Sequence, residues 1–161
     1  MLETPFGPMQ IAVDADGVLV EVRLPNRGRS EETPAAWPVS AQEGAEEARA
    51  QLSEYFARKR RDFALRVRPS GSNFERIVWQ RLLTIPFGAT TSYGAIAAEL
   101  GLVNGARAVG RANGSNPIPI VIPCHRVIGI NGTLTGYGGG LPLKQALLEH
   151  EGALHAAPRL F

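Results

Sequence analysis

The sequence of 161 residues predicts an α+β fold, with a small N-terminal β-sheet and one helix before a mainly helical C-terminal domain. Two patterns predict this class. Apolar residues alternate with their neighbours between positions 9 and 24, as in strands with one buried face, and recur at helical spacing from position 74 onward. Between the two patterns, Pro69 to Asn73 is rich in turn-forming residues. We therefore divide the chain into an N-terminal domain, 1–69, and a C-terminal domain, 70–161.

The first elements of the N-terminal domain are a hairpin and a loop. Alternation predicts the β-hairpin over residues 9–24, with its turn at 14–17. The following stretch, 26–38, is polar, charged and interrupted by proline, so we expect a loop there. Its Arg27 and Arg29 are candidates for a contact with DNA or with a neighbouring molecule.

A helix and a strand complete the predicted N-terminal domain. Residues 41–56 carry apolar side chains at helical spacing, which predicts the helix. Phe63, Leu65 and Val67 then alternate with polar or small residues, which predicts a strand.

Three helices are predicted in the C-terminal domain. The first covers 74–82, after a capping serine or asparagine in the linker. The second covers 93–100 and ends at Gly101, a residue that suits the position just after a helix. The third covers about 105–112. The second and third form a candidate helix-turn-helix, although short helix pairs are also common in α-rich cores that bind no DNA.

The third predicted helix is built almost entirely from small residues. Ala106 and Gly110 would let its backbone approach a duplex closely, while Arg107 and Arg111 supply positive charge. A helix that reads base edges in the major groove would carry more asparagine, glutamine or arginine. This composition favours close approach to DNA over recognition of a base sequence.

Composition limits the classes of function. Seventeen basic and fifteen acidic side chains give a net charge of only +2, so any DNA-binding surface must be a local patch. No apolar stretch approaches the ~18 to 20 residues of a membrane span, and the first residues lack the features of a signal peptide. We expect a cytoplasmic protein that associates with no membrane and acts as a monomer.

The sequence also argues against a bound metal or cofactor. Its single cysteine, Cys124, excludes an intramolecular disulfide and a zinc site with several cysteines. The glycines at 138–140 do not follow a strand and open a βαβ unit, as a dinucleotide site requires. We therefore expect no metal and no cofactor.

Cys124 is the candidate for chemistry. It follows the apolar run 120–122 and Pro123, and it precedes His125. A lone thiol beside a histidine is a candidate nucleophile, but free cysteine is also among the most buried residue types, so inert packing is the alternative. Neighbours on an extended strand point to opposite faces, so adjacency alone does not show that the thiol and the imidazole meet.

Several stretches in register resemble one known family. They are Ser92–Ala97, Ala106–Gly110, Asn116–Gly129, Gly136–Gly140, which follows a short predicted hairpin, and Leu147–Gly152. From about Phe74 to Gly152 the chain resembles the O6-alkylguanine-DNA alkyltransferases, whose signature Pro-Cys-His-Arg-Val begins here at Pro123. The resemblance implies DNA repair by direct reversal. An alkyl group would pass irreversibly, once per protein molecule, from O6 of guanine in double-stranded DNA to Cys124, with O4 of thymine as a second candidate target.

The resemblance also assigns the residues that activate the thiol. His125 would reach Cys124 through a water molecule and take its proton, and a glutamate of the last helix would orient His125. Glu151 occupies the matching position, whereas Glu149, two residues away, faces a different direction on a helix. His150 and His155 match no functional position, and we interpret them as surface or packing residues.

Access to the lesion requires base flipping, because a stacked base keeps its O6 substituent out of reach of a protein nucleophile. By resemblance, Arg107 enters the stack in place of the flipped guanine, from a helix that lies in the minor groove together with Ala106 and Gly110. Tyr93 assists flipping and donates a hydrogen bond to guanine N3. Arg111 is assigned to a phosphate contact.

The base pocket is also assigned by resemblance. Tyr137 forms one wall, and Gly138 stands where many members have serine, so only its backbone N–H could donate to O6. The carbonyls of Cys124 and Val127 would accept from the guanine amino group. Asn116 matches a buried asparagine that ties the helix-turn-helix to the active-site strand, a supporting role.

Three other functions are weighed against this one. A binding module that flips the damaged base without chemistry would lack the cysteine, which Cys124 contradicts. A cysteine hydrolase would need an oxyanion hole and an acyl cleft, and would leave the arginine-bearing helix unexplained. A transcriptional regulator with a methyl-accepting sensor domain would need a second cysteine in the N-terminal half.

Overall fold

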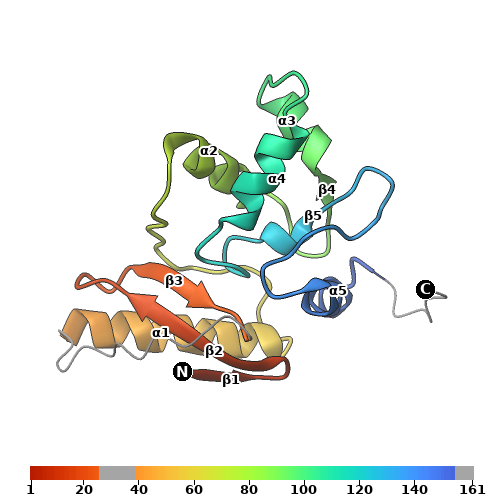
Figure 1. Cartoon of the computed structure of the whole chain (residues 1–161). Coiled ribbons are helices and arrows are strands. Elements are labelled where there is room, and N and C mark those ends of the chain that lie inside the picture. The colour runs from red at the N-terminus through yellow and green to blue at the C-terminus, as the bar shows by residue number, and fades with distance from the viewer. Residues whose placement is uncertain (26–38, 155–161) are drawn as a thin grey trace.

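The computed structural model describes residues 1–25 and 39–154 of the chain (Figure 1). The predicted loop 26–38, with Arg27 and Arg29, lies outside the described residues, as does His155. Among the residues described, no helix is long and apolar enough to cross a membrane.

The N-terminal half is a three-stranded antiparallel sheet with one helix along it. Strands β1 (Leu2–Thr4), β2 (Gly7–Val13) and β3 (Leu19–Arg23) lie in the order β1-β2-β3. Helix α1 (Val39–Phe56) packs against this sheet (Figure 1). The predicted hairpin and helix are confirmed. The short strand β1 was not predicted, because three residues are too few to show an alternating pattern.

The hairpin departs from strict alternation at its turn end. The pairing of β2 with β3 shifts register between Ala12 and Val13, so that Val13 pairs with Leu19. Leu19 is consequently buried, whereas Val20, one of the residues expected on the buried face, is only half-buried. A bulge of this kind adds one residue to a strand and moves side chains to the opposite face.

The strand predicted at 63–67 is wrong. Only Val67 forms a bridge, with Leu19, through two backbone hydrogen bonds of 3.0 and 2.8 Å that join Leu19 to Arg66 and Arg68. The alternating side chains of this segment do pack against the core as half-buried residues. Alternation therefore reported a one-sided burial correctly, but the segment pairs with β3 only at this one parallel bridge and forms no strand.

The predicted helices of the C-terminal half are confirmed. Helix α2 (Asn73–Leu82) begins with a capping box, in which the side chains of Ser72 and Glu75 bond each other's backbone N–H. Helix α3 (Tyr93–Glu99) is capped by Ser92, and α4 (Ala106–Gly114) packs directly against it. Gly101 follows α3 with a φ of +72°, as a residue after a helix often has.

The region around Cys124 differs from the expected strand and hairpin. Residues Cys124–Arg126 form one 3₁₀ turn, and the strand that follows, β5 (Val127–Ile128), pairs in parallel with β4 (Thr91–Ser92). The chain then reverses at Gly129 to Thr133 without a second strand, so the predicted active-site hairpin is wrong. The last helix is α5 (Leu141–His150).

The two halves share one hydrophobic core. Buried residues of α1, such as Leu52 and Tyr55, belong to the same cluster as Trp79 of α2 and Leu147 of α5. The backbone N–H of Val22 also bonds the carbonyl of Pro117 across the halves, at 2.9 Å. The division at residue 69 stays a prediction.

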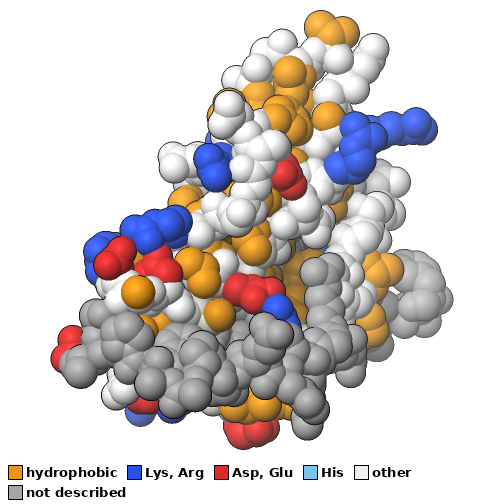
Figure 2. All heavy atoms as spheres, turned by 60° about the vertical axis from the view of Figure 1, so that its left-hand side comes forward, with side chains coloured by type: hydrophobic (Ala, Val, Ile, Leu, Met, Phe, Trp, Pro, Cys, Tyr) orange, Lys and Arg blue, Asp and Glu red, His pale blue; other side chains and the backbone are white. Residues whose placement is uncertain are grey.

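Charges on the molecular surface are mixed. On the face shown in Figure 2, lysine and arginine side chains lie in separate small groups, several of them beside acidic side chains. This view agrees with a net charge of only +2, and the described residues form no continuous basic surface on that face.

Replacing Gly44 by alanine is expected to destabilise the fold. A Cβ atom at this position of α1 would lie 2.5 Å from the Cα of Gly17 in the hairpin turn, where backbone must move to relieve the clash. Overpacking of this kind lowers the free energy of unfolding by about 1–3 kcal/mol. Urea unfolding of Gly44→Ala measures the loss.

The matched control is Gly94→Ala in α3. No heavy atom lies within 4 Å of its added Cβ. Alanine has the higher helix propensity, so this variant should be unchanged or more stable by up to about 1 kcal/mol. Equal effects of the two substitutions would contradict the close packing of α1 on the turn.

Candidate active site

A tight turn positions Cys124. Ile120, at a φ of +74°, lies in a turn closed by the hydrogen bond from Ile122 N–H to the Ile118 carbonyl at 2.9 Å. A β-branched residue rarely adopts this backbone region, so the surrounding contacts must enforce it. The buried side chain of Asn116 helps to enforce this conformation. Its amide accepts from Ile118 N–H at 2.9 Å and donates to the Ile122 carbonyl at 2.8 Å.

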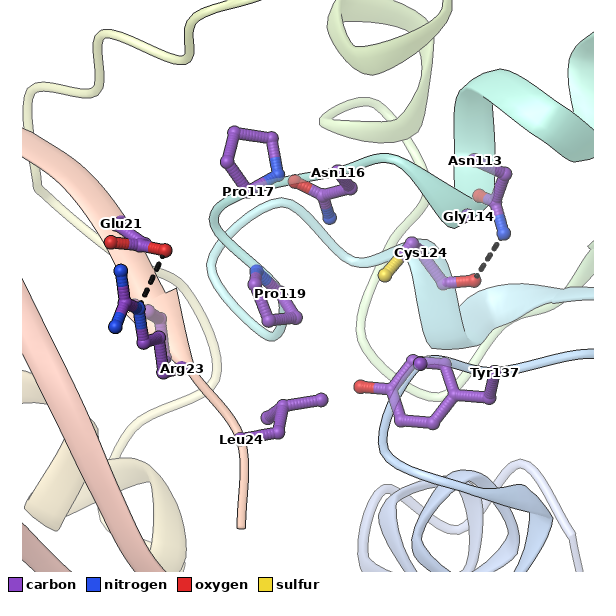
Figure 3. A pocket seen from close by; sticks show the side chains of 12 residues that line it. Glu21, Arg23, Leu24, Asn113, Gly114, Asn116, Pro117, Pro119, Cys124 and Tyr137 are labelled. Carbon is purple, nitrogen blue, oxygen red and sulfur yellow. Dashed lines mark hydrogen bonds and ion pairs between the residues drawn. The ribbon is translucent and has the colours of Figure 1, made fainter. Parts of the chain in front are cut away.

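The Cys124 side chain is 4% exposed and lines a pocket of about 250 Å³ (Figure 3). Its sulfur faces the interior of the pocket, with Pro119 and Tyr137 nearby. The Cys124 carbonyl points the other way and accepts hydrogen bonds from Asn113 Nδ2, at 3.2 Å, and from Val127 N–H. The side chain of the cysteine therefore faces the pocket, while its backbone carbonyl is hydrogen-bonded on the opposite side.

The N-terminal half forms the opposite wall of this pocket. Strand β3 contributes Glu21 and Arg23, which form an ion pair of 2.8 Å, and the next residue, Leu24, lies across from Tyr137 (Figure 3). Asn116 and Gly138 also line the pocket. The pocket beside the thiol is therefore built by both halves of the chain.

His125 points away from the pocket into the core. Its side chain is wholly buried, and Nε2 lies 2.8 Å from Oε1 of Glu151. Among the described residues, none forms a hydrogen bond with the buried Nδ1. Burial lowers the pKa of His125, although the bond to Glu151 opposes this effect. A neutral ring that donates from Nε2 has a lone pair on Nδ1, which is the form that a base requires.

Glu151 is the centre of a buried polar cluster. Its carboxylate accepts from Arg126 Nε and Nη2, both at 2.9 Å, and from the Tyr55 hydroxyl at 2.8 Å, in addition to His125. Burial alone would raise the pKa of Glu151, but the hydrogen bonds from His125 and Arg126 outweigh it and hold the pKa well below its ordinary value. Glu149 is half-buried and accepts from Gln145 at 2.8 Å instead.

A second hollow, of about 500 Å³, lies on the helix-turn-helix side. Tyr93 of α3 and Ala106, Arg107 and Gly110 of α4 line it. It shares Gly114, Tyr137 and Gly138 with the thiol pocket. The structure thus brings most of the predicted DNA-binding residues to a hollow that adjoins the pocket of Cys124.

Arg111 and Val127 lie apart from these hollows. Arg111 is exposed on α4, and its carbonyl accepts from Ser115. Val127 is wholly buried beside the 3₁₀ turn. His150, which matched no functional position, is half-buried with Nε2 2.9 Å from the Tyr55 carbonyl.

Besides Glu21, Arg23 and Leu24 of the pocket wall, sequence reasoning assigned no role to several residues that make hydrogen bonds in the site. They are Tyr55, Asn113, Arg126 and Lys144. Lys144 is wholly buried, and its Nζ contacts the Thr135 carbonyl at 2.8 Å and the Tyr93 hydroxyl at 3.3 Å. Arg126 lies within the signature around Cys124, and its position there was the one available signal. Tyr55 lies 96 residues from Glu151, and no local pattern connects them.

The described residues contain no group of three or more histidine, cysteine, aspartate or glutamate side chains that could hold a metal ion. The chemistry that this part of the chain offers is that of a thiol beside a pocket, backed by a buried histidine and carboxylate.

Comparison with known proteins gives concordant matches. Residues 73–153 match the family model described as 6-O-methylguanine DNA methyltransferase, DNA binding domain. A methylated-DNA–protein-cysteine methyltransferase of Methanosarcina acetivorans is 44% identical over 153 residues, covering 95% of this chain and 97% of that protein. One from Mycolicibacterium paratuberculosis is 47% identical over 156 residues, covering 93% and 89%.

A solved structure agrees with these matches over both halves of the chain. The crystal structure of Mycobacterium tuberculosis OGT in complex with DNA superposes with a TM-score of 0.83 at 44% identity. The superposition covers 94% of this chain and 91% of that one.

Acidification is expected to destabilise the protein through His125. Its pKa in the folded state lies below the ordinary 6.5, so the unfolded chain binds this proton first as the pH falls. The free energy of unfolding should decrease below about pH 6.5, by up to about 1.4 kcal/mol per pH unit from this group. The lowered pKa of Glu151 adds a further loss below its ordinary 4.5.

Urea unfolding at several values between about pH 8 and pH 5 measures this slope. The variant His125→Gln removes the titrating group, so its stability, though lower throughout, should depend less on pH in this range. A slope identical to that of the unchanged protein would show that other groups control the acid response.

Proposed function

Because the chain belongs to the methylated-DNA–protein-cysteine methyltransferase family, we propose that Cys124 is the residue that accepts the alkyl group. The protein repairs DNA by direct reversal, through transfer of an alkyl group from DNA to a cysteine of its own chain. Cys124 is its only cysteine. The observation that carries the proposal is the position of this thiol in a pocket, next to a buried His125–Glu151 pair.

The proposed substrate is O6-alkylguanine in double-stranded DNA, with O4-alkylthymine as a second candidate. The Cys124 sulfur attacks the alkyl carbon, the S–C bond forms, and the bond from that carbon to O6 breaks. Thiolate is needed, and a free thiol with a pKa near 8.5 provides only a few per cent of it at neutral pH. His125 takes the proton at Nδ1 through a water molecule, while Glu151 holds the protonated imidazole at Nε2.

The leaving guanine gains charge and needs a donor. The Tyr93 hydroxyl is assigned to guanine N3, and Lys144 Nζ lies 3.3 Å from that hydroxyl. The Gly138 backbone N–H is assigned to O6, since stabilisation of developing charge requires only a positioned amide. The Cys124 carbonyl already accepts from Asn113 Nδ2, so a guanine amino group at this carbonyl would replace or share that bond.

Entry of the base is assigned to the second hollow. Arg107 occupies the gap in the stack that the flipped nucleotide leaves, and the small residues Ala106 and Gly110 allow α4 to lie close to the minor groove. Arg111, exposed on the same helix, is assigned to a phosphate. Because Tyr137 and Gly138 line both hollows, a base entering from the DNA side meets the wall of the thiol pocket.

The product is a thioether, which is a poor leaving group, so each protein molecule acts once. We include in the proposal that the protein acts as a monomer in the cytoplasm, where a reducing environment keeps its single thiol available.

Incubation with duplex DNA that contains one O6-methylguanine should methylate the protein once. The intact mass is expected to rise by one methyl-for-hydrogen replacement and then to stop rising, because the acceptor is consumed. Cys124→Ser, measured alongside, should gain nothing. Tight binding of the damaged duplex without a mass change would indicate a lesion-binding module. If the protein shows no binding and no mass change, hydrolase chemistry would be favoured instead.

Replacement of Arg107 by alanine should separate base flipping from chemistry. We expect alkyl transfer from duplex DNA to slow by about tenfold or more, since flipping costs a few kcal/mol. Transfer from the free base O6-benzylguanine should be unchanged, because a free base needs no flipping. The matched control is Arg76→Ala, an exposed arginine of α2, which should alter neither rate. Equal slowing with both substrates would remove Arg107 from this role.

A further inference from the structure

Tyr55 of the N-terminal half reaches the carboxylate behind the proposed base. Its side chain is wholly buried, and its hydroxyl donates to Glu151 Oε1 at 2.8 Å. The same oxygen lies 2.8 Å from His125 Nε2 and 2.9 Å from Arg126 Nη2. The tyrosine and the histidine therefore donate to one atom, and a change at either donor alters the other bond.

The surroundings leave Tyr55 little freedom. Its ring contacts Phe63, Phe87 and His150, with centroid distances between 4.9 and 6.1 Å. Burial, together with the neighbouring carboxylate, raises the pKa of Tyr55 far above its ordinary value. The hydroxyl thus stays protonated throughout the pH range in which the protein acts, and it always donates a hydrogen bond.

The backbone around Tyr55 is also tied to the helix that carries the carboxylate. The ring of His150 contacts the Tyr55 carbonyl through Nε2 at 2.9 Å, and Arg58 Nη1 donates to the His150 carbonyl at 2.9 Å. These bonds join the end of α1 to the end of α5, one residue before Glu151. The phenol and the carboxylate are therefore held at both their backbones and their side chains.

We propose that Tyr55 is a positioning residue for alkyl transfer, which holds Glu151 and sets how strongly this carboxylate attracts the His125 N–H. The inference rests on the function proposed above. A donor on Oε1 draws electron density from the carboxylate, and so weakens its pull on the imidazole proton. Without the phenol, Glu151 would carry more of its charge toward His125 and favour the protonated ring.

A protonated His125 cannot take the proton of Cys124. The proposal therefore predicts that loss of the Tyr55 hydroxyl raises the pKa of His125. Among the described residues, the other charged or titratable groups near Tyr55, Glu151 and His125 are Arg58 after α1, Cys124 and Arg126 of the turn, and Lys144 and His150 of α5. A change confined to the phenol leaves all of them in place.

The test is Tyr55→Phe, which removes one oxygen atom and keeps the ring. The rate of Cys124 alkylation by the free base O6-benzylguanine is followed by intact mass across about pH 5.5 to 8.5, so that DNA binding does not enter. We expect the acidic limb of the pH–rate profile to move to higher pH by about half a unit to one unit. Because the pKa of His125 starts below its ordinary 6.5, the rate should fall by up to about tenfold on the acidic limb and by no more than about threefold at neutral pH.

Two controls distinguish positioning from packing. Arg58→Ala removes the neighbouring bond between α1 and α5 without touching the carboxylate, so it should lower stability and leave the acidic limb in place. Difluorotyrosine placed at position 55 is a stronger donor than tyrosine and should move the limb to lower pH. This second replacement also decides the matter should Tyr55→Phe fail to fold.

An acidic limb that stays in place in Tyr55→Phe and in the difluorotyrosine protein would overturn the inference, even if stability falls, and would leave the proposed function standing. If the unchanged protein shows no alkylation of Cys124, the proposed function fails and this inference fails with it.

Discussion

A carboxylate buried in the core, that of Glu151, constrains much of the rest of the structure. Taking a charge out of water costs several kcal/mol unless partners surround it, so the fold must bring donors to this point. Four donor atoms from three residues do so: the Tyr55 hydroxyl, Nε2 of His125, and two nitrogens of Arg126. They come from the end of α1 and from the turn that carries Cys124, so the carboxylate fixes the relation between these two segments and α5.

The 3₁₀ turn places the two neighbouring residues, Cys124 and His125, in different surroundings. On an extended strand, Cys124 and His125 would simply alternate between faces. In the turn, the cysteine faces the pocket, while the histidine enters the core and meets Glu151. Asn116 holds the preceding loop through the Ile122 carbonyl, and Asn113 holds the turn itself through the Cys124 carbonyl, so the turn keeps this geometry without a regular sheet around it.

The sequence predicted the features that depend on interactions between residues close together in the chain, and it failed where distant segments meet. Helices α2 and α3 were predicted because their caps and periodicity lie within a few neighbouring residues, such as Ser72 and Glu75. The strand at 63–67 was wrong because alternation reports burial of one face, whereas pairing depends on a partner elsewhere in the chain. The hairpin after Cys124 was wrong because β5 pairs with the distant β4.

The same limit applies within the site. A family resemblance picked Glu151 over Glu149, and the structure places Glu151 at the imidazole of His125. It assigned nothing to Tyr55, whose contact with Glu151 spans 96 residues and leaves no mark on local spacing. Strand β3 contributes Glu21 and Arg23 to the wall opposite the thiol, again by a contact between distant segments. The N-terminal half thus contributes to both sides of the reacting group, with one wall of its pocket and one donor to its buried carboxylate. A boundary near residue 69 in the sequence is therefore not a boundary in the chemistry, because neither the pocket nor the carboxylate cluster is complete without residues from both halves.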